Sequence, residues 1–397
     1  MFLRAPFTKP FLWLGHTHIL MLRNHDKSMS QATPACRAAL LQLLQAALWG
    51  SVPCARAFDR LTASDWEGVF QASQVQAVTA LACQGLSLLP DECYPDDALL
   101  ARWMASVARV ERHSRHMNEV LLTLLEFFSR HGLQPVVLKG QGIARLYSHP
   151  LLRECGDIDL YFLLPGQGRD ALRVLREAGT RPQRKPDGSY LYAWQGVPVE
   201  HHPRITDLAS PLARRHVAAM ESLFPCQSVS LGMGHEAQVT VPSPTLSLLL
   251  QTAHVLKHAL GWGTGLRQMA DMAVTLHAQH GQIDGHAYRH ACSLAHILRW
   301  NALLHGFLTQ CLALPLECLP YGDRLCDSRP LQERVWRDGN FGQARSRHAL
   351  EASPGWAGKC RTALSLLGHV RFGMAYAPVE TLLTSLSLAS GQFALDK

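Results

Sequence analysis

Two aspartates lie two residues apart in GDIDLYF, residues 156–162, a run that is otherwise apolar. The run predicts a β-strand, and alternate residues of a strand share one face. Asp157 and Asp159 therefore point the same way, while the apolar residues between and after them point into a core. Neighbouring carboxylates repel each other unless a cation lies between them, and one hard divalent ion bound by both would remove that cost. A bare pair of this kind is also typical of a solvated strand edge, so the surrounding sequence has to decide.

Two nearby features of the sequence favour a metal site over a solvated strand edge. The run LKGQG, residues 138–142, ends a short β-branched stretch with glycines. Backbone amides at such a turn from strand to helix can hold phosphate. A third acid, Glu200, lies in VPVEHH, residues 197–202, which predicts a neighbouring strand. Three carboxylates from two strands, opposite a turn that holds phosphate, is the layout that two-metal phosphoryl transfer requires.

The elements that position these residues form a small α/β core. In order, we expect a strand, a short helix, a strand, an amphipathic helix and a hairpin that turns at Gln195 and Gly196. These elements cover residues 135–140, 142–149, 157–164, 169–179, 190–194 and 197–202. Residues 36–131, and the chain from Pro244 onward, instead show helical periodicity.

The predicted fold class is α+β, with a small mixed-sheet core flanked by helical regions. The expected boundaries are 29–131 for the N-terminal helical region, 132–243 for the core and 244–397 for the C-terminal helical domain. The start of the chain loosely imitates a signal peptide, but its apolar part is interrupted and no small-residue cleavage site follows. We expect residues 1–28 to be a disordered or mis-assigned N-terminal extension, with the native product beginning at Met29.

Composition narrows the class of protein. Of the 397 residues, 47% are hydrophobic and 17% are charged, which is typical of a globular protein with ample core material. The net charge of +7 suits a phosphate-rich ligand. The sequence shows no dense track of Lys and Arg interleaved with aromatic residues, which argues against long nucleic acid as a partner. The eleven cysteines include no C-x-x-C pair, which favours a reducing cytoplasm over a disulfide framework. There is also no uninterrupted apolar run of about 18 residues, so we expect no membrane span.

Three stretches together resemble the uncharacterised nucleotidyltransferase family of the polymerase-β-like superfamily. The run LKGQGIARLYSHPLLRECGDIDLYF resembles the family's motif L-K-G-x-x-L-x-x-x-Y-x-x-P-x-x-R-x-x-x-D-I-D, VEHHPRI resembles V-D-L-H-W-R-L, and QTAHVLKHALGWGTGLRQMADMA resembles its helical part. The matching residues are Lys139, Gly140, Tyr147, Pro150, Arg153, Asp157, Asp159, Glu200, His202, His254, His258, Arg267 and Asp271. The chain departs from the pattern in two places: Gly140-Gln141-Gly142 replaces the usual Gly-Ser or Gly-Gly, and Glu200 replaces an aspartate.

The resemblance implies nucleotidyl transfer. Asp157, Asp159 and Glu200 would be the catalytic residues and would hold Mg²⁺ or Mn²⁺. A hydroxyl of an unknown small-molecule, sugar or peptide acceptor would attack the α-phosphorus of an NTP, most simply ATP, so that AMP is transferred and pyrophosphate leaves. The nucleotide would be bound by Lys139, Gly140, Gln141, Gly142 and Arg153. Alternatives are a non-catalytic nucleotide-binding regulatory protein on the same fold, and a toxin-like transferase that acts on tRNA or protein.

The helical part offers further candidates for contacts with the acceptor or the phosphates, namely His202, His254, His258, Arg267 and Asp271. The i, i+4 spacing of His254 and His258 can bind zinc, but no third ligand is evident, and packed or cleft-facing histidines are the better interpretation. Arg267 and Asp271 share the same spacing, so they form either an intrahelical ion pair or a guanidinium that Asp271 aims at phosphate. We expect Lys257, on a different face, to be solvated.

Overall fold

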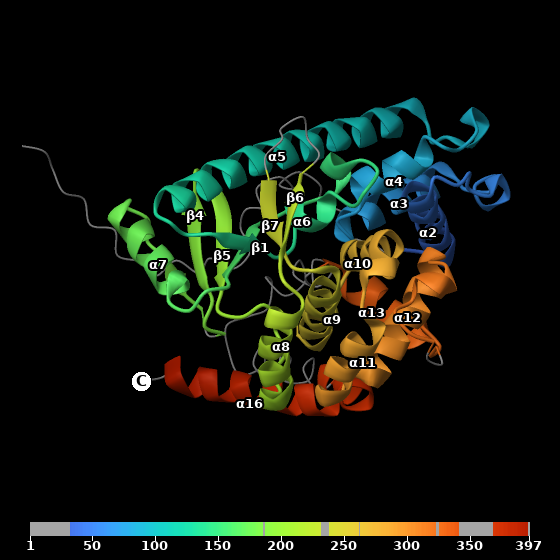
Figure 1. Cartoon of the computed structure of the whole chain (residues 1–397). Helices are drawn as coiled ribbons and strands as arrows, with labels where there is room; N and C mark the ends of the chain where they lie inside the picture. Colours follow the sequence, from blue (N-terminus) through green and yellow to red (C-terminus); the bar gives the residue numbers. More distant parts are fainter. Residues whose placement is uncertain are drawn as a thin grey trace, which may run out of the picture. The chain divides into compact units, whose positions relative to one another are not determined.

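A computed structural model describes residues 32–185, 187–231, 238–261, 263–322, 325–340 and 368–395. The expected N-terminal extension, residues 1–28, lies outside these ranges. Within them the protein combines a mixed five-stranded sheet with helical flanks, which confirms the predicted α+β class (Figure 1). None of the helices in these ranges is both long enough and apolar enough to span a bilayer.

The sheet has the strand order β1-β2-β5-β4-β3. Its strands are β1 (Pro135–Val137), β2 (Ile158–Phe162), β3 (Gln183–Arg184), β4 (Tyr190–Trp194) and β5 (Val197–His202). Strands β2 and β5 run parallel, and every other pair is antiparallel. Gln195 and Gly196 connect β4 to β5 with φ angles of 47° and 83°, the positive values that a tight hairpin turn needs.

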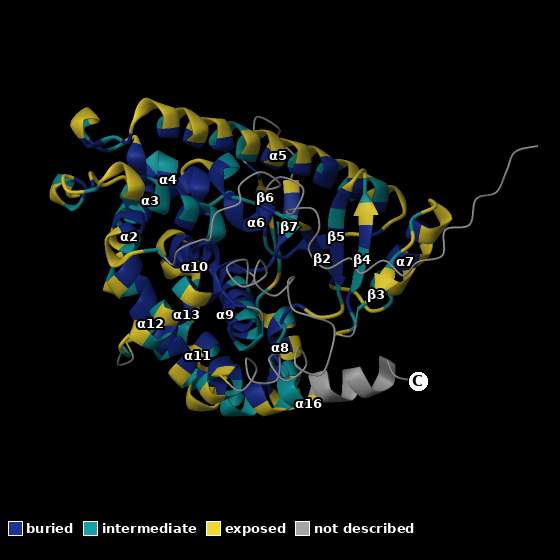
Figure 2. Ribbon diagram, turned by 180° about the vertical axis from the view of Figure 1, so that it is seen from behind, coloured by how far each residue is buried: buried dark blue, intermediate teal, exposed yellow. Residues whose placement is uncertain are grey.

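One face of the sheet packs on helices. Ile158, Leu160 and Val199 are fully buried against α5 (Asp97–Arg130) and α7 (Gln167–Glu177). Helix α5 turns one apolar stripe toward the sheet, and its outer side is exposed along its length (Figure 2). The charged residues that alternate with these apolar ones in β2 and β5 must therefore lie on the opposite face.

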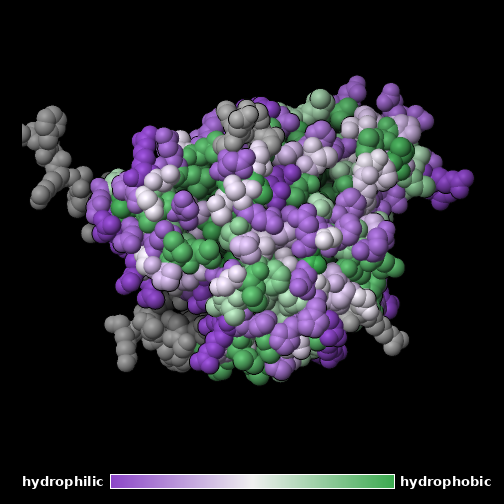
Figure 3. All heavy atoms as spheres, viewed as in Figure 1, coloured by the Kyte–Doolittle hydropathy of each residue, from purple (hydrophilic) through white to green (hydrophobic). Residues whose placement is uncertain are grey.

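Most of the remaining helices contribute to one large hydrophobic core that joins the N-terminal and C-terminal regions. The N-terminal elements are α2 (Pro34–Trp49), η1 (Ala55–Ala57), α3 (Ala63–Val75), α4 (Thr79–Leu86) and η2 (Asp91–Cys93). The C-terminal elements are α9 (Pro244–Leu260), α10 (Leu266–Gln279), η4 (His280–Gln282), α11 (Gly285–Leu294), α12 (Leu298–Leu312), η5 (Leu316–Cys318), α13 (Arg329–Asp338) and α16 (Pro378–Leu395). The two regions are also linked by hydrogen bonds, since Trp49 Nε1 donates to Leu312 O at 2.6 Å and Gln76 Nε2 donates to Val335 O at 2.8 Å. On the face seen in Figure 3, hydrophobic side chains are interspersed with hydrophilic ones.

Local differences from the expected elements lie around the sheet. The helix expected over residues 142–149 is a single turn, α6 (Gln141–Ala144), followed by η3 (Pro150–Leu152). Two further elements were not predicted from the sequence: α8 (Pro211–Leu223) and the separate hairpin of β6 (Gln227–Ser230) and β7 (Gln238–Val241). Strand β7 packs beside the turn after β1. Val241 Cγ1 is so near to Gly142 that a Cβ added at Gly142 would lie only 3.2 Å from it.

Candidate active site

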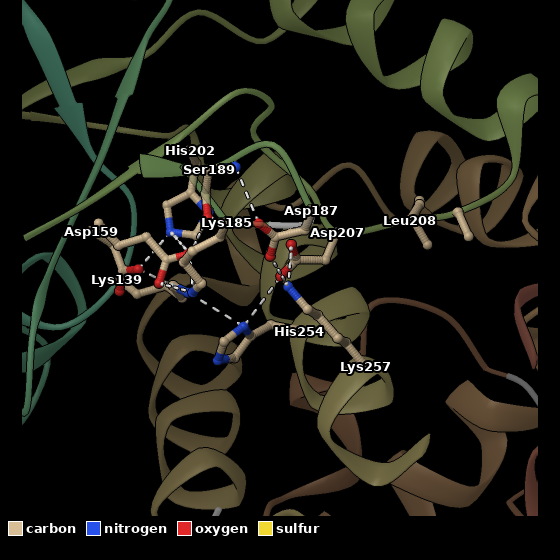
Figure 4. Close-up of polar contacts among 12 residues, drawn as sticks. Lys139, Asp159, Lys185, Asp187, Ser189, His202, Asp207, Leu208, His254 and Lys257 are labelled. Atoms are coloured by element: carbon tan, nitrogen blue, oxygen red, sulfur yellow. Dashed lines mark hydrogen bonds and ion pairs between the residues drawn. The ribbon is translucent and has the colours of Figure 1, made fainter. Parts of the chain in front are cut away.

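Asp159 and Glu200 lie side by side because β2 and β5 are parallel and in register at these two residues. His202 follows two residues later in β5 and shares the same face. Ligand atoms of Asp159, Glu200 and His202 all lie within 4.8 Å of one another. His202 Nε2 lies 2.6 Å from Asp159 Oδ1 and 3.9 Å from Glu200 Oε1. All three side chains are largely buried, so the sheet holds a compact group of two carboxylates and an imidazole on the face away from its core. Asp159 and His202 point toward each other in Figure 4.

Asp157, the first acid of the D-x-D motif, lies just before β2 and is exposed, outside the group of three. Loss of solvation and the negative charge of Asp159 raise the pKa of Asp157 to about 6. Because solvent reaches the Asp157 side chain, we attribute more of the shift to the neighbouring charge. The pKa of Asp159 moves the other way. Burial opposes its ionisation, but Lys139 and the hydrogen bond to His202 hold its pKa well below the usual range.

The turn after β1 brings a lysine to the acids. Lys139 Nζ lies 3.1 Å from Asp159 Oδ1 and 3.3 Å from His254 Nδ1. The next residue, Gly140, has φ 56° and ψ −111°, a conformation that only glycine adopts without strain. Gln141 is 3% exposed, and neither atom of its side-chain amide has a hydrogen-bond partner among the described residues. The turn therefore places a cation against Asp159 and carries, two residues later, a buried amide without a partner among the described residues.

A second layer of charges surrounds the first. Lys185 Nζ lies 2.9 and 2.8 Å from the two oxygens of Glu200, and Ser189 Oγ donates to Glu200 Oε1 at 2.8 Å. Lys257, on α9, bridges Asp187 at 3.2 Å and Asp207 at 3.1 Å. The expectation of a solvated Lys257 is therefore wrong: its side chain is 38% exposed, but its ammonium group joins two carboxylates.

His254 completes this layer. Its Nδ1 lies 3.4 Å from Asp207 Oδ2, so the network runs continuously from Lys257 to Asp159 (Figure 4). Burial and the charge of Lys139 lower the pKa of His254 to about 4, so the ring is neutral at pH 7. Its neighbour His258 stacks edge-on against it with ring centroids 4.4 Å apart. Within the described part of the chain, the two histidines belong to no group of three potential metal ligands.

Arg153 and Asp271 form a buried ion pair with each other. Arg153 donates from Nε and Nη2 to the two Asp271 oxygens at 3.1 and 2.6 Å, and Tyr147 Oη donates to Asp271 Oδ1 at 2.8 Å. The remaining guanidinium nitrogen of Arg153 donates to Glu154 O at 3.2 Å. These contacts fasten the segment before β2 to α10. A direct contact of Arg153 or Asp271 with nucleotide stays a prediction.

Arg267 interacts electrostatically with Asp157. Its Nη1 donates to Glu154 O at 3.0 Å. Burial and the charge of Arg153 lower the pKa of Arg267, while Asp271 and Asp157 oppose that change. In return, the charge of Arg267 opposes the rise in the pKa of Asp157. Of the cations that the sequence offered for phosphate, Lys139 and Arg267 are thus the two with an electrostatic link to the D-x-D motif.

Sequence reasoning missed Lys185, Asp187, Ser189 and Asp207. One signal for part of this group was available. The chain has only seven lysines. The three in the described residues, at positions 139, 185 and 257, all have an ammonium group within 3.3 Å of a carboxylate oxygen in this network. Arginine supplies most of the positive charge of this chain, so lysine is the rarer cation. The few lysines were therefore candidates for one common site.

Comparison with known proteins identifies the family of the chain. The sequence profile of the family described as "Uncharacterised nucleotidyltransferase" matches residues 62–312, which run from the start of α3 to the end of α12 and contain every residue of the site. No curated protein and no solved structure gives a significant match. The match covers more than half of the chain, and the chain therefore belongs to the uncharacterised nucleotidyltransferase family.

Proposed function

We propose that the protein is a nucleotidyltransferase that depends on Mg²⁺ or Mn²⁺ and transfers AMP from ATP to a hydroxyl group of an acceptor. The observation that carries this proposal is the pairing of Asp159 with Glu200 on adjacent parallel strands, with Asp157 beside them. Such a cluster of carboxylates opposes folding unless cations offset its charge, and Lys139 and Lys185 offset only part of it. The family match supports nucleotidyl transfer as the reaction class.

The donor set fits a hard divalent cation. Carboxylate oxygens are the ligands that Mg²⁺ and Mn²⁺ prefer, and an oxygen of Asp159 and one of Glu200 lie within 4.8 Å of each other. Asp157, Asp159 and Glu200 would hold the metal. When bound, it would neutralise phosphate charge and lower the pKa of the acceptor hydroxyl.

The chain's own residues would place the nucleotide. Lys139 and Arg267 are the candidates to neutralise the phosphates. Within the turn, the backbone N–H groups of Gly142 and Ile143 already donate to Lys139 O and Gly140 O. Gly140 and Gln141 are therefore the candidate donors, and the buried Gln141 amide would gain the partner that it lacks in the described residues. This arrangement uses Gln141 where the superfamily commonly has serine or glycine.

The acceptor side of the site would be formed by His202 and His254. His202 positions Asp159 through their 2.6 Å contact. The neutral His254 ring lies between Lys139 and Asp207 and can hydrogen-bond a hydroxyl group. In the reaction, the acceptor oxygen loses its proton and forms a bond to the α-phosphorus. The bond from that phosphorus to the oxygen bridging to the β-phosphate breaks, and pyrophosphate leaves with the electron pair.

Label transfer tests this proposal. The purified protein is incubated with each of the four α-³²P-labelled NTPs, Mg²⁺ or Mn²⁺, and a cell extract as the source of acceptor. We expect label to appear on an acceptor with ATP and to be lost in Asp159→Asn. The matched control is Glu221→Gln. Glu221 lies in α8 and accepts a hydrogen bond at 2.9 Å from Tyr161 Oη, whose residue lies in the same strand as Asp159, but Glu221 is outside the acidic group. Absence of metal-dependent NTP binding by the folded wild-type protein would rule the proposal out.

A further inference from the structure

The acidic site is already neutralised in part by cations of the chain itself. Its five carboxylates and three ammonium groups together carry a formal charge of −2, and the nearby guanidinium group of Arg267 adds one positive charge. The carboxylates are Asp157, Asp159, Asp187, Glu200 and Asp207, and the ammonium groups are those of Lys139, Lys185 and Lys257. A divalent ion that enters this site must therefore compete with lysine for the same oxygens.

Lys185 is the lysine in the most direct competition. Its ammonium group lies within 2.9 Å of both oxygens of Glu200, so it contacts the carboxylate through both of its ligand atoms. Lys139 contacts one oxygen of Asp159, at 3.1 Å, and Lys257 contacts Asp187 and Asp207 instead of the acids of the D-x-D motif. A metal ion that takes Glu200 as a ligand therefore competes with the Lys185 ammonium group for the same two oxygens.

The position of Lys185 allows that movement. It directly follows the two-residue edge strand β3, and its side chain is 38% exposed, whereas that of Glu200 is 12% exposed. A lysine ammonium is a compact charge on a flexible stem and can exchange partners without a change in the backbone. Once displaced, it needs another anion within its reach. The phosphates of a bound nucleotide would supply one beside the same acids.

We propose, on the basis of the proposed function, that Lys185 occupies the Glu200 metal position in the absence of nucleotide and moves to the nucleotide phosphates when metal binds. Lys185 thereby couples the two ligands. It weakens metal binding to the free protein and strengthens nucleotide binding to the metal-loaded protein. Because such coupling is reciprocal, bound nucleotide increases the affinity for metal by the same factor as metal increases the affinity for nucleotide.

The test measures Mn²⁺ affinity from the loss of the electron paramagnetic resonance signal of free Mn²⁺. Removing one competing unit charge in Lys185→Met should tighten Mn²⁺ binding about tenfold in the absence of nucleotide. Lys185→Arg keeps the charge and should stay close to wild type. Lys257→Met is the matched control, since its side chain is equally exposed and ion-paired but does not contact Glu200; we expect it to change the affinity by less than about threefold.

A second titration measures the affinity of α,β-methylene-ATP at saturating Mn²⁺ by calorimetry. Lys185→Met should bind this analogue about three- to tenfold more weakly than wild type, because one phosphate contact is lost. Circular dichroism and thermal melting confirm that each variant is folded.

The outcomes separate the inference from the proposed function. If wild type binds Mn²⁺ but Lys185→Met binds it equally or more weakly, the role of Lys185 is refuted and the proposed function stands. The role of Lys185 is likewise refuted if Lys185→Met binds Mn²⁺ more tightly but its affinity for the analogue is unchanged. If Mn²⁺ binding is absent in every variant, or is unaffected by Asp159→Asn, the metal site itself is refuted.

Discussion

The buried ion pair between Arg153 and Asp271 should be a main support of the site, and Asp271→Asn tests it. The substitution keeps the volume of the side chain but removes its charge. The pair is 8% and 7% exposed, and Arg153 makes two hydrogen bonds to the carboxylate. Removing one partner of such a pair leaves a buried charge uncompensated and costs about 3–5 kcal/mol of unfolding free energy. Tyr147→Phe removes a single bond to the same carboxylate and should cost less, about 1.5–3 kcal/mol.

Urea unfolding, followed by the fluorescence of the nine tryptophans, measures this effect. With a slope of about 3 kcal/mol/M, the Asp271→Asn midpoint should fall by about 1–1.7 M. The matched control is Glu177→Gln on α7, whose ion pair with Arg173 is 60% exposed on both sides. Its loss should cost less than about 0.5 kcal/mol. A midpoint in Asp271→Asn that falls no further than in Glu177→Gln would refute the structural role of the pair.

Three further predictions concern the acids, the turn and the sheet core. The pKa of Asp157 is raised above that of a free aspartate, so protons compete for this ligand as the pH falls through that raised pKa. Mn²⁺ affinity should then fall about tenfold per pH unit, and a titration of Asp157→Asn should lack this dependence. Gly140→Ala forces a side chain into a positive φ of 56°, so its unfolding free energy should drop by about 1–3 kcal/mol, while Gly168→Ala, with open space around it and no positive φ, should be tolerated in the same urea assay. Burial lowers the pKa of His201 to about 3. Between pH 6.5 and 3 the unfolded state therefore binds a proton that the folded state does not, so the wild-type protein loses stability as the pH falls. The unfolding free energy of His201→Phe should fall less steeply with pH than that of wild type.

The arrangement of the sheet around the D-x-D motif could be read from the sequence. The alternation in DIDLYF predicted which face of β2 is polar, and the Gln195-Gly196 turn predicted the hairpin that carries Glu200. Placing Asp159 beside Glu200 required one more fact, the parallel register of β2 and β5. That register follows from how the chain crosses over between the strands, which the residues of neither strand encode alone.

The charged layer around the acids could not be predicted in the same way. Lys185, Asp187 and Asp207 lie in segments between regular elements, where no periodicity indicates the direction of a side chain. Lys257 looked like a solvated helix residue, because its two partners come from 70 and 50 residues earlier in the chain. Arg153 and Asp271 matched family positions, but only the folded structure shows that they pair across 118 residues.

The central claim is that the Asp157, Asp159 and Glu200 cluster transfers a nucleotidyl group. The most direct measurement compares ATP labelled at the α-phosphate with ATP labelled at the γ-phosphate under identical conditions, for wild type and Asp159→Asn. We predict that the wild-type protein transfers the α label to an acceptor and releases the γ label in pyrophosphate. Asp159→Asn should show neither activity. Transfer of the γ label to the acceptor, or α transfer that persists in Asp159→Asn, would contradict the assignment of this cluster as the catalytic centre.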